Sequence, residues 1–210
     1  MPKAFSDQEK EALRAKLREK GKKLFEKQGL KKTRIDELTG AVGISKGAFY
    51  LLYESKEELF LEILEELETD FRASIFDFAI EPREDARRLL ARLLTSALLT
   101  WDRYPLLKDI GVAEFEYLAR KLPAERIQAH ANRDNQFVED FIEKIRSEGI
   151  TVKASPRVVS GLMMSLFFVS LHRNDLGESV YTETMEVLAD LVAGYIVGAA
   201  SPTTIKRSKR

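Results

Sequence analysis

Gly-Ile-Ser-Lys-Gly-Ala-Phe-Tyr-Leu-Leu-Tyr occupies residues 43–53, and this stretch decides the fold that we expect. Gly43 stands where a helix would end, at a position whose positive φ is costless only for glycine. Ser45 is placed as the N-cap of a second helix over residues 46–52. A helix of barely two turns is too short to be stable alone. It does fit the major groove of duplex DNA, which admits one α-helix.

Two capping patterns flank this stretch and define its neighbours. Residues 33–36 read Thr-Arg-Ile-Asp, an S/T-x-x-D arrangement, which predicts that Thr33 caps a helix ending at Gly43. Residues 55–58 read Ser-Lys-Glu-Glu and form a second capping box, which opens a long helix. Two short helices joined by a tight glycine turn make a helix-turn-helix, and the second of them is the reading helix.

Residues from about 8 to 60 resemble the DNA-binding domain of the TetR family of bacterial transcriptional regulators. The first helix ends Leu-Phe-Glu-Lys-Gln-Gly-Leu at residues 24–30, which is similar to the family's Leu-Phe-x-x-x-Gly-aromatic ending. The chain departs from the family at Arg34, where Ser or Thr is usual, and at Leu52, where His or Tyr often touches a phosphate. The other matching positions are Thr33, Ile35, Leu38, Gly43, Ser45, Lys46, Gly47, Tyr50 and residues 56–59.

The expected DNA contacts follow from this reading helix. Lys46 lies in its first turn and is expected to meet a base edge or a phosphate. Gly47 lacks a Cβ, which lets the backbone approach DNA closely. Ala48 is either core filler or a methyl that meets a thymine methyl, and the sequence leaves both open. The resemblance implies that the Tyr50 hydroxyl binds a phosphate.

Helix N-termini offer further phosphate sites, because their backbone N–H groups favour anions. Thr33 and Lys56 stand at two such ends and would add a hydroxyl and an ammonium. The complete set of expected DNA-binding residues is Thr33, Arg34, Ser45, Lys46, Gly47, Ala48, Tyr50 and Lys56.

Charge supports this interpretation once the chain is divided. The whole protein is neutral, with 34 basic and 34 acidic residues. Residues 1–56 hold 14 Lys or Arg against 8 Asp or Glu, and the remainder holds 20 against 26, so the two parts carry +6 and −6. Such asymmetry suits a basic end that faces a polyanion and an acidic body held away from it.

Composition argues against other classes of protein. There is no cysteine and there are only two histidines, so we expect no disulfide, no metal and no cofactor. No nucleophile motif is present, and the glycines at 40, 43 and 47 lack the Gly-Lys-Ser/Thr order of a phosphate loop, so we expect no enzyme. The uncharged apolar run over residues 158–171 is too short to span a bilayer, and no signal-peptide pattern opens the chain. We therefore expect a cytoplasmic protein without a membrane partner.

The expected fold is all-α. An N-terminal three-helix helix-turn-helix domain (residues 1–55) precedes a helical effector-binding and dimerisation domain (56–201) and a basic tail (202–210). Helices are expected over residues 56–78, 83–104, 124–147, 155–172 and 178–200, with shorter ones within 106–122. Residues 158–169 are apolar around nearly the whole circumference, and such a helix must be covered on every side. We expect a homodimer through residues 155–173 and 178–200, as the resemblance also implies, while a monomer with a three-layer core is the alternative.

Aromatic side chains in the middle of the chain suggest an effector pocket, although such residues are usually simple core. The resemblance implies a small-molecule effector site in this domain, and the aromatic residues lead us to expect an apolar or amphipathic effector that releases a repressor from a palindromic DNA operator. The expected pocket residues are Trp101, Phe115, Tyr117, Phe137, Phe141, Met164, Phe168 and His172. The alternative is a constitutive DNA-binding protein, or an all-helical dimeric scaffold, that has no effector.

Overall fold

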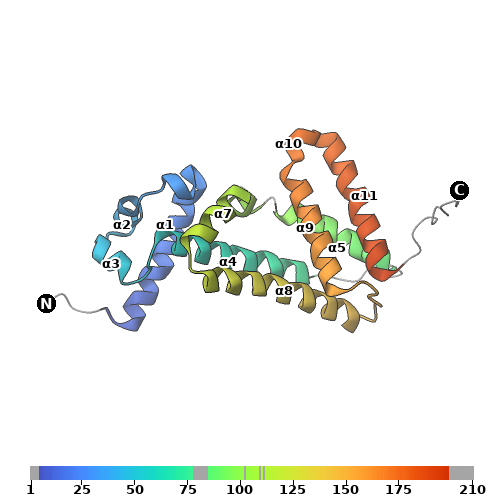
Figure 1. Ribbon diagram of the computed structural model, residues 1–210, viewed down its shortest axis with the longest axis horizontal. Coiled ribbons are helices and arrows are strands. Elements are labelled where there is room, and N and C mark those ends of the chain that lie inside the picture. Colours follow the sequence, from blue (N-terminus) through green and yellow to red (C-terminus); the bar gives the residue numbers. More distant parts are fainter. Residues whose placement is uncertain (1–4, 78–84, 102, 109, 111, 199–210) are drawn as a thin grey trace, which may run out of the picture. The chain divides into compact units, whose positions relative to one another are not determined.

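The computed structural model describes residues 5–77, 85–101, 103–108, 110 and 112–198, and this part of the chain is all-α, as predicted. None of its helices is long and apolar enough to cross a membrane. In chain order they are α1 (Asp7–Lys32), α2 (Ile35–Val42), α3 (Lys46–Tyr50), α4 (Lys56–Phe76), α5 (Ala86–Trp101), α6 (Pro105–Lys108), α7 (Val112–Lys121), α8 (Ala124–Ser147), α9 (Pro156–Leu171), α10 (Arg173–Leu176) and α11 (Glu178–Val197), as labelled in Figure 1.

Most of the expected helix ends agree with these bounds. The prediction for residues 124–147 matches α8, and α9 ends one residue before the expected His172. The helix expected to reach Tyr104 ends at Trp101. Tyr104 precedes Pro105, and a residue before proline is disfavoured in the α conformation. The ends expected at residues 78, 83 and 200 lie outside the described residues.

The chain packs as two compact units. One lies within residues 1–70 and 104–130, and the other within residues 71–103 and 131–210. Helices α4 and α8 therefore contribute residues to both units. The domain boundary expected between residues 55 and 56 stays a prediction.

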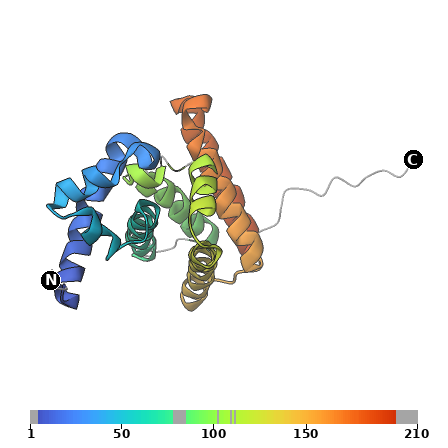
Figure 2. The ribbon, with the colours of Figure 1, turned by 60° about the vertical axis from the view of Figure 1, so that its left-hand side comes forward.

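The first unit is built around α1. Figures 1 and 2 show α2 beside α1 and α3 beside α2, and the same pairs of helices are in contact. Phe25 of α1 meets Phe60 of α4 edge to face, with ring centroids 5.0 Å apart, and both are buried. At Gly21 the helices approach closely, because an added Cβ would lie 3.3 Å from Ile63 Cδ1. Helix α6 packs against α1 in this unit and buries Leu106 and Leu107.

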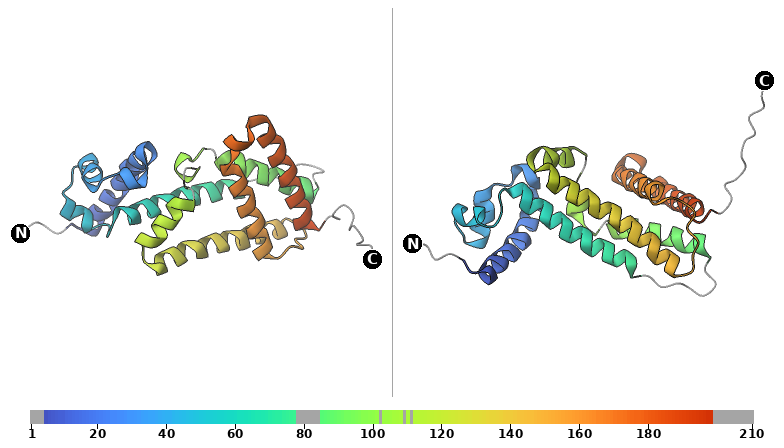
Figure 3. Two further views of the ribbon diagram at one scale, coloured as in Figure 1. Left: turned by 45° about the horizontal axis from the view of Figure 1, so that its top comes forward. Right: turned by 60° about the horizontal axis from the view of Figure 1, so that its bottom comes forward.

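The second unit has α5, α9 and α11 at its centre. Figure 3 shows α9 and α11 side by side, joined through the short α10. Leu90 of α5, Val159 of α9 and Ala193 of α11 are fully buried in one apolar core. The guanidinium of Arg87 on α5 pairs with both carboxylate oxygens of Asp190 on α11, with Nε 2.8 Å from Oδ1. This ion pair links α5 to α11.

Candidate nucleic-acid interface

Helix α3 is fixed at its start by the residues that the sequence indicated. Gly43 has φ 76° and ends α2, and its N–H donates to the carbonyl of Thr39 at 2.9 Å. Ser45 is the N-cap of α3, where its Oγ accepts the N–H of Ala48 at 3.1 Å. Both predictions are therefore confirmed. The helix is shorter than expected and ends at Tyr50, because the N–H groups of Leu52 and Tyr53 both turn back to the carbonyl of Phe49 at 2.9 Å.

The buried side of α3 holds it against the first unit. Phe49 is fully buried and Ala48 is 9% exposed, followed by Leu52 and Tyr53 in the core. The rings of Phe49 and Tyr53 lie 5.9 Å apart. Of the two roles open to Ala48, this burial favours packing over a contact with DNA. Leu52 stands where a His or Tyr often touches a phosphate in the family that the sequence resembles. Its side chain is buried here and therefore packs in the core.

The opposite side of α3 is open and carries Ser45, Lys46, Gly47 and Tyr50. The Lys46 ammonium lies 2.9 Å from Asp36 Oδ1, and both side chains are more than half exposed. Exposed ion pairs of this kind contribute only about 0–1 kcal/mol. The Lys46 ammonium can therefore leave Asp36 and bind a phosphate at little cost. An added Cβ at Gly47 would meet nothing closer than Ser45 Oγ at 3.8 Å, so intramolecular packing does not require glycine there.

Thr33 and Lys56 have structural partners. The expectation that Thr33 caps α2 is wrong, because Arg34 is the N-cap and its N–H donates to Glu37 Oε2 at 2.7 Å. That hydrogen bond is the main reason why the pKa of Glu37 lies below its usual value. Thr33 instead ends α1: the helix kinks at Gly29, with φ 78°, and the buried hydroxyl of Thr33 donates to the Gly29 carbonyl at 2.8 Å.

The Lys56 ammonium donates to three carbonyls at the end of α1, those of Leu30 at 2.8 Å, Lys31 at 3.2 Å and Thr33 at 2.7 Å. It therefore complements the negative end of that helix. A phosphate contact from Lys56 would compete with these bonds. Arg34 is exposed beside this junction, and its contact with DNA stays a prediction.

Part of the expected pocket lies in the first unit. The Tyr117 hydroxyl of α7 donates to the buried carboxylate of Glu57 at 2.7 Å. This hydrogen bond is the main reason why the pKa of Tyr117 is raised to about 12. Phe115 is 38% exposed, and its ring centroid lies 6.0 Å from that of His130.

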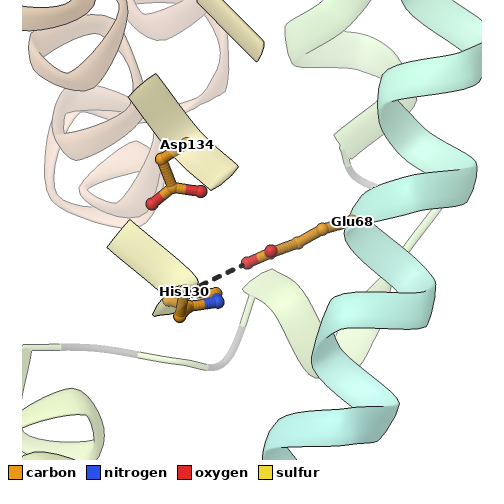
Figure 4. A group of neighbouring side chains, drawn as sticks. All are labelled: Glu68, His130 and Asp134. Atoms are coloured by element: carbon orange, nitrogen blue, oxygen red, sulfur yellow. Dashed lines mark ion pairs between the residues drawn. The ribbon is translucent and has the colours of Figure 1, made fainter. Parts of the chain in front are cut away.

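His130 joins a buried ionic group between α4 and α8. Its Nε2 lies 3.7 Å from Glu68 Oε1, as the dashed line in Figure 4 marks, and its Nδ1 lies 3.5 Å from Glu65 Oε1. The Arg126 guanidinium donates to both oxygens of Glu65 at 2.6 Å. These contacts fasten the start of α8 to α4 within the first unit.

The other expected pocket residues lie in the second unit. The Trp101 ring packs edge to face between Phe71 at 4.8 Å and Phe167 at 4.9 Å. Phe137 and Phe141 have centroids 6.4 Å apart. Three of the expected residues, Met164, Phe168 and His172, are instead exposed.

Two features of the structure were not expected from the sequence. Leu51, directly after α3, is 67% exposed. The Trp101 Nε1 is buried and has no hydrogen-bond acceptor among the described residues. The helical period places Leu51 four residues after Gly47 on the open side of α3, and this spacing was the available signal.

Two short helices joined by a glycine turn, the second capped at its start and held by its buried side on a compact unit, form a helix-turn-helix, a motif that many DNA-binding proteins share. Residues 17–63 match the family described as bacterial regulatory proteins of the tetR family. The HTH-type transcriptional regulator AcrR of Shigella flexneri is 28% identical over 141 residues, which cover 64% of this chain and 62% of that protein. The matched segment contains α2 and α3, so the N-terminal part of this chain is similar to the DNA-binding domain of tetR-family transcriptional regulators.

Solved structures share the fold over nearly the whole chain. A TetR-family regulator from Pectobacterium atrosepticum has a TM-score of 0.63 at 15% identity and covers 92% of this chain and 98% of its own. One from Mesorhizobium loti has a TM-score of 0.61 at 16% identity, with 90% and 96% covered. The regulator FadR from Bacillus subtilis, solved in complex with stearoyl-CoA, has a TM-score of 0.56 at 15% identity, with 87% and 98% covered. At these identities the likeness shows the fold alone.

Proposed function

We propose that this protein is a ligand-responsive repressor that binds a palindromic DNA operator as a homodimer. The observation that carries the proposal is the open side of α3, where Lys46, Gly47 and Tyr50 are exposed on a helix whose other side is buried. Two such helices must lie about 34–36 Å apart to enter successive major grooves on one face of DNA.

An apolar stripe on the last helices supports dimerisation. Val180, Val187, Leu191 and Tyr195 of α11 are each more than half exposed and follow one another at spacings of 7, 4 and 4 residues, which puts them on one side of the helix. Exposed large apolar residues in a row mark an interaction surface. The proposed interface is the homodimer contact through residues 155–173 and 178–200, to which α9 contributes Val158, Met164 and Phe168.

The aromatic cluster of the second unit supports an effector site. Its rings are apolar, while the buried Trp101 N–H has no acceptor among the described residues. A buried donor without an acceptor is costly, and a ligand that brings an acceptor oxygen removes that cost. We infer an amphipathic effector, and the structural neighbour FadR was solved in complex with an amphipathic compound, stearoyl-CoA.

The effector would act through the spacing of the reading helices. A ligand that binds better to a dimer of different spacing lowers the affinity for DNA in proportion to that preference. A coupling free energy of about 1–3 kcal/mol gives a 5–150-fold response. The proposal places the protein in the cytoplasm, with residues 1–55 as the DNA-binding domain, 56–201 as the effector and dimerisation domain and 202–210 as a basic tail.

Selection of bound fragments from genomic DNA tests the DNA-binding part of the proposal. We expect one palindromic motif, and an affinity that falls about 10³–10⁵-fold between 50 and 200 mM salt if the dimer makes roughly 6–10 phosphate contacts. A flat salt response would reject DNA as the partner. The effector is tested separately, with a series of fatty acyl compounds that is screened for changes in both melting temperature and DNA affinity. If operator binding is selective and no compound changes either quantity, the protein is a constitutive DNA-binding protein.

A further inference from the structure

Leu51 is the most exposed large hydrophobic side chain in the part of the chain that the structure describes, at 67%. It directly follows α3, and its φ of −78° and ψ of −15° continue the helical conformation for one more residue. Its direction is therefore set by the same turn that exposes Gly47 four residues earlier and Tyr50 beside it. An apolar side chain so placed gains nothing from folding and is available to a partner.

Packing does not require a leucine at this position. The core beneath α3 is filled by Phe49, Leu52 and Tyr53, each no more than 3% exposed. Leu51 belongs instead to the open side of α3, four residues after Gly47, where the proposed interface with DNA lies. It is continuous with that interface and distant in sequence from the apolar stripe on α11.

Leucine restricts what can be recognised. Its side chain has no hydrogen-bond donor and no charge, so it cannot bind a phosphate or a polar base edge. The major groove offers one apolar feature, the C5 methyl group of thymine. We propose that Leu51 reads a thymine methyl in each half-site of the operator. This inference rests on the proposed function, and it adds a specificity residue directly after α3 that the sequence pattern alone did not single out.

Uracil differs from thymine only by that methyl group, so it isolates the contact. Burial of one methylene-sized group contributes about 0.8 kcal/mol, so loss of the methyl should weaken binding about fourfold per half-site and about 15-fold for both. The experiment starts from the operator selected with the wild-type protein. Each thymine is replaced by deoxyuridine in symmetric pairs, and the dissociation constant is measured for wild type and for Leu51→Ala.

We expect at least one symmetric thymine pair whose replacement weakens wild-type binding about 15-fold and leaves Leu51→Ala binding unchanged. A Lys46→Ala variant serves as the matched control: it should bind more weakly overall but keep the full uracil effect, because a different side chain is removed. Thermal melting confirms that both variants fold, which their exposed positions favour.

The outcomes separate this inference from the proposed function. Selective, salt-dependent binding with no uracil effect, or with an effect of equal size in wild type and Leu51→Ala, overturns the role of Leu51 and leaves the proposed function in place. Failure to select any DNA rejects the proposed function itself. A uracil effect that is lost only in Lys46→Ala assigns the methyl contact to the lysine stem instead.

Discussion

The ammonium of Lys56 donates to the carbonyl of Thr33 at 2.7 Å, across 23 residues of sequence. The same ammonium also donates to the carbonyls of Leu30 and Lys31, so one cation at the start of α4 caps the C-terminal end of α1. The carbonyls at a helix C-terminus lack partners within the helix and carry its negative dipole end. Lys56 thereby fixes the junction from which α2 and α3 leave.

Replacement of Lys56 by Met should lower the stability of the protein, because the Lys56 ammonium binds three backbone carbonyls. Methionine keeps most of the stem but removes the ammonium, and hydrogen bonds to a charged group contribute about 1.5–3 kcal/mol. At about 2–4 °C per kcal/mol for a chain of this size, we expect the melting temperature to fall by roughly 3–12 °C. Thermal unfolding of wild type and Lys56→Met measures the difference.

Lys32→Met is the matched control, because Lys32 is an exposed lysine at the end of α1, the helix whose last carbonyls Lys56 binds. It should melt within about 2 °C of wild type, as exposed substitutions usually change stability by less than 0.5 kcal/mol. Equal melting temperatures for both variants would mean that the Lys56 bonds contribute nothing net. A phosphate role for Lys56 would then regain support.

A second pair of variants tests the close packing of α1 on α4. Gly21→Val would put side-chain carbons where the Ile63 methyl and the leucines at 38 and 59 already lie within 3.4 Å of a Cβ. Overpacking of this kind costs about 1–3 kcal/mol. Gly40→Val, in an open stretch of α2 where an added Cβ meets nothing within 4 Å, should change the free energy of unfolding by less than about 0.5 kcal/mol. Denaturant unfolding of the two variants should rank them in that order, and the reverse order would contradict the packing.

The sequence predicted those parts of the interface that depend on near neighbours. The glycine stop at Gly43 and the Ser45 cap both follow from hydrogen bonds that span three or four residues. Thr33 shows where this reasoning fails. Its hydroxyl can serve the helix before it or the helix after it, and the kink at Gly29 decides for the former.

Longer-range partners were beyond prediction for a physical reason. Nothing in the pattern around Lys56 indicates that carbonyls 23 to 26 residues away converge on its ammonium. The same holds for the second unit. The apolar circumference of residues 158–169 predicts that the helix is covered, but only the packing shows that Val159 and Leu166 face the core while Phe168 is left exposed.

The Tyr117 to Glu57 bond makes a prediction about pH. The pKa of Tyr117 is raised from 10.0 to about 12 by this bond, so the folded state keeps the proton at a pH where the unfolded chain loses it. Its contribution to stability is complete below pH 10 and is lost as the pH rises from about 10 to 12.

The difference in melting temperature between wild type and Tyr117→Phe should therefore shrink over this range. Lysine and the other tyrosines titrate in both proteins and cancel in the comparison. A difference that stays constant to pH 12 would show that the hydroxyl does not hold its proton through Glu57.

The last prediction concerns the apolar stripe of α11 and its neighbour on α9. Phe168→Glu and Leu191→Glu each place a charge at a side chain that is 45% and 51% exposed in the single chain, so neither change should disturb the core. In a dimer through this surface the same charge would be buried without a partner, which costs about 3–5 kcal/mol and should weaken dimerisation at least about 100-fold. Sedimentation equilibrium measures the change, and Glu186→Lys, an exposed charge reversal on α11 outside the stripe, should leave the dimer intact.

Because two half-sites bind together only when the subunits are joined, operator affinity should fall in parallel while a single half-site is bound as before. An unchanged dimer in both glutamate variants would move the interface to another surface. A monomer that keeps full operator affinity would remove dimerisation from the proposed function.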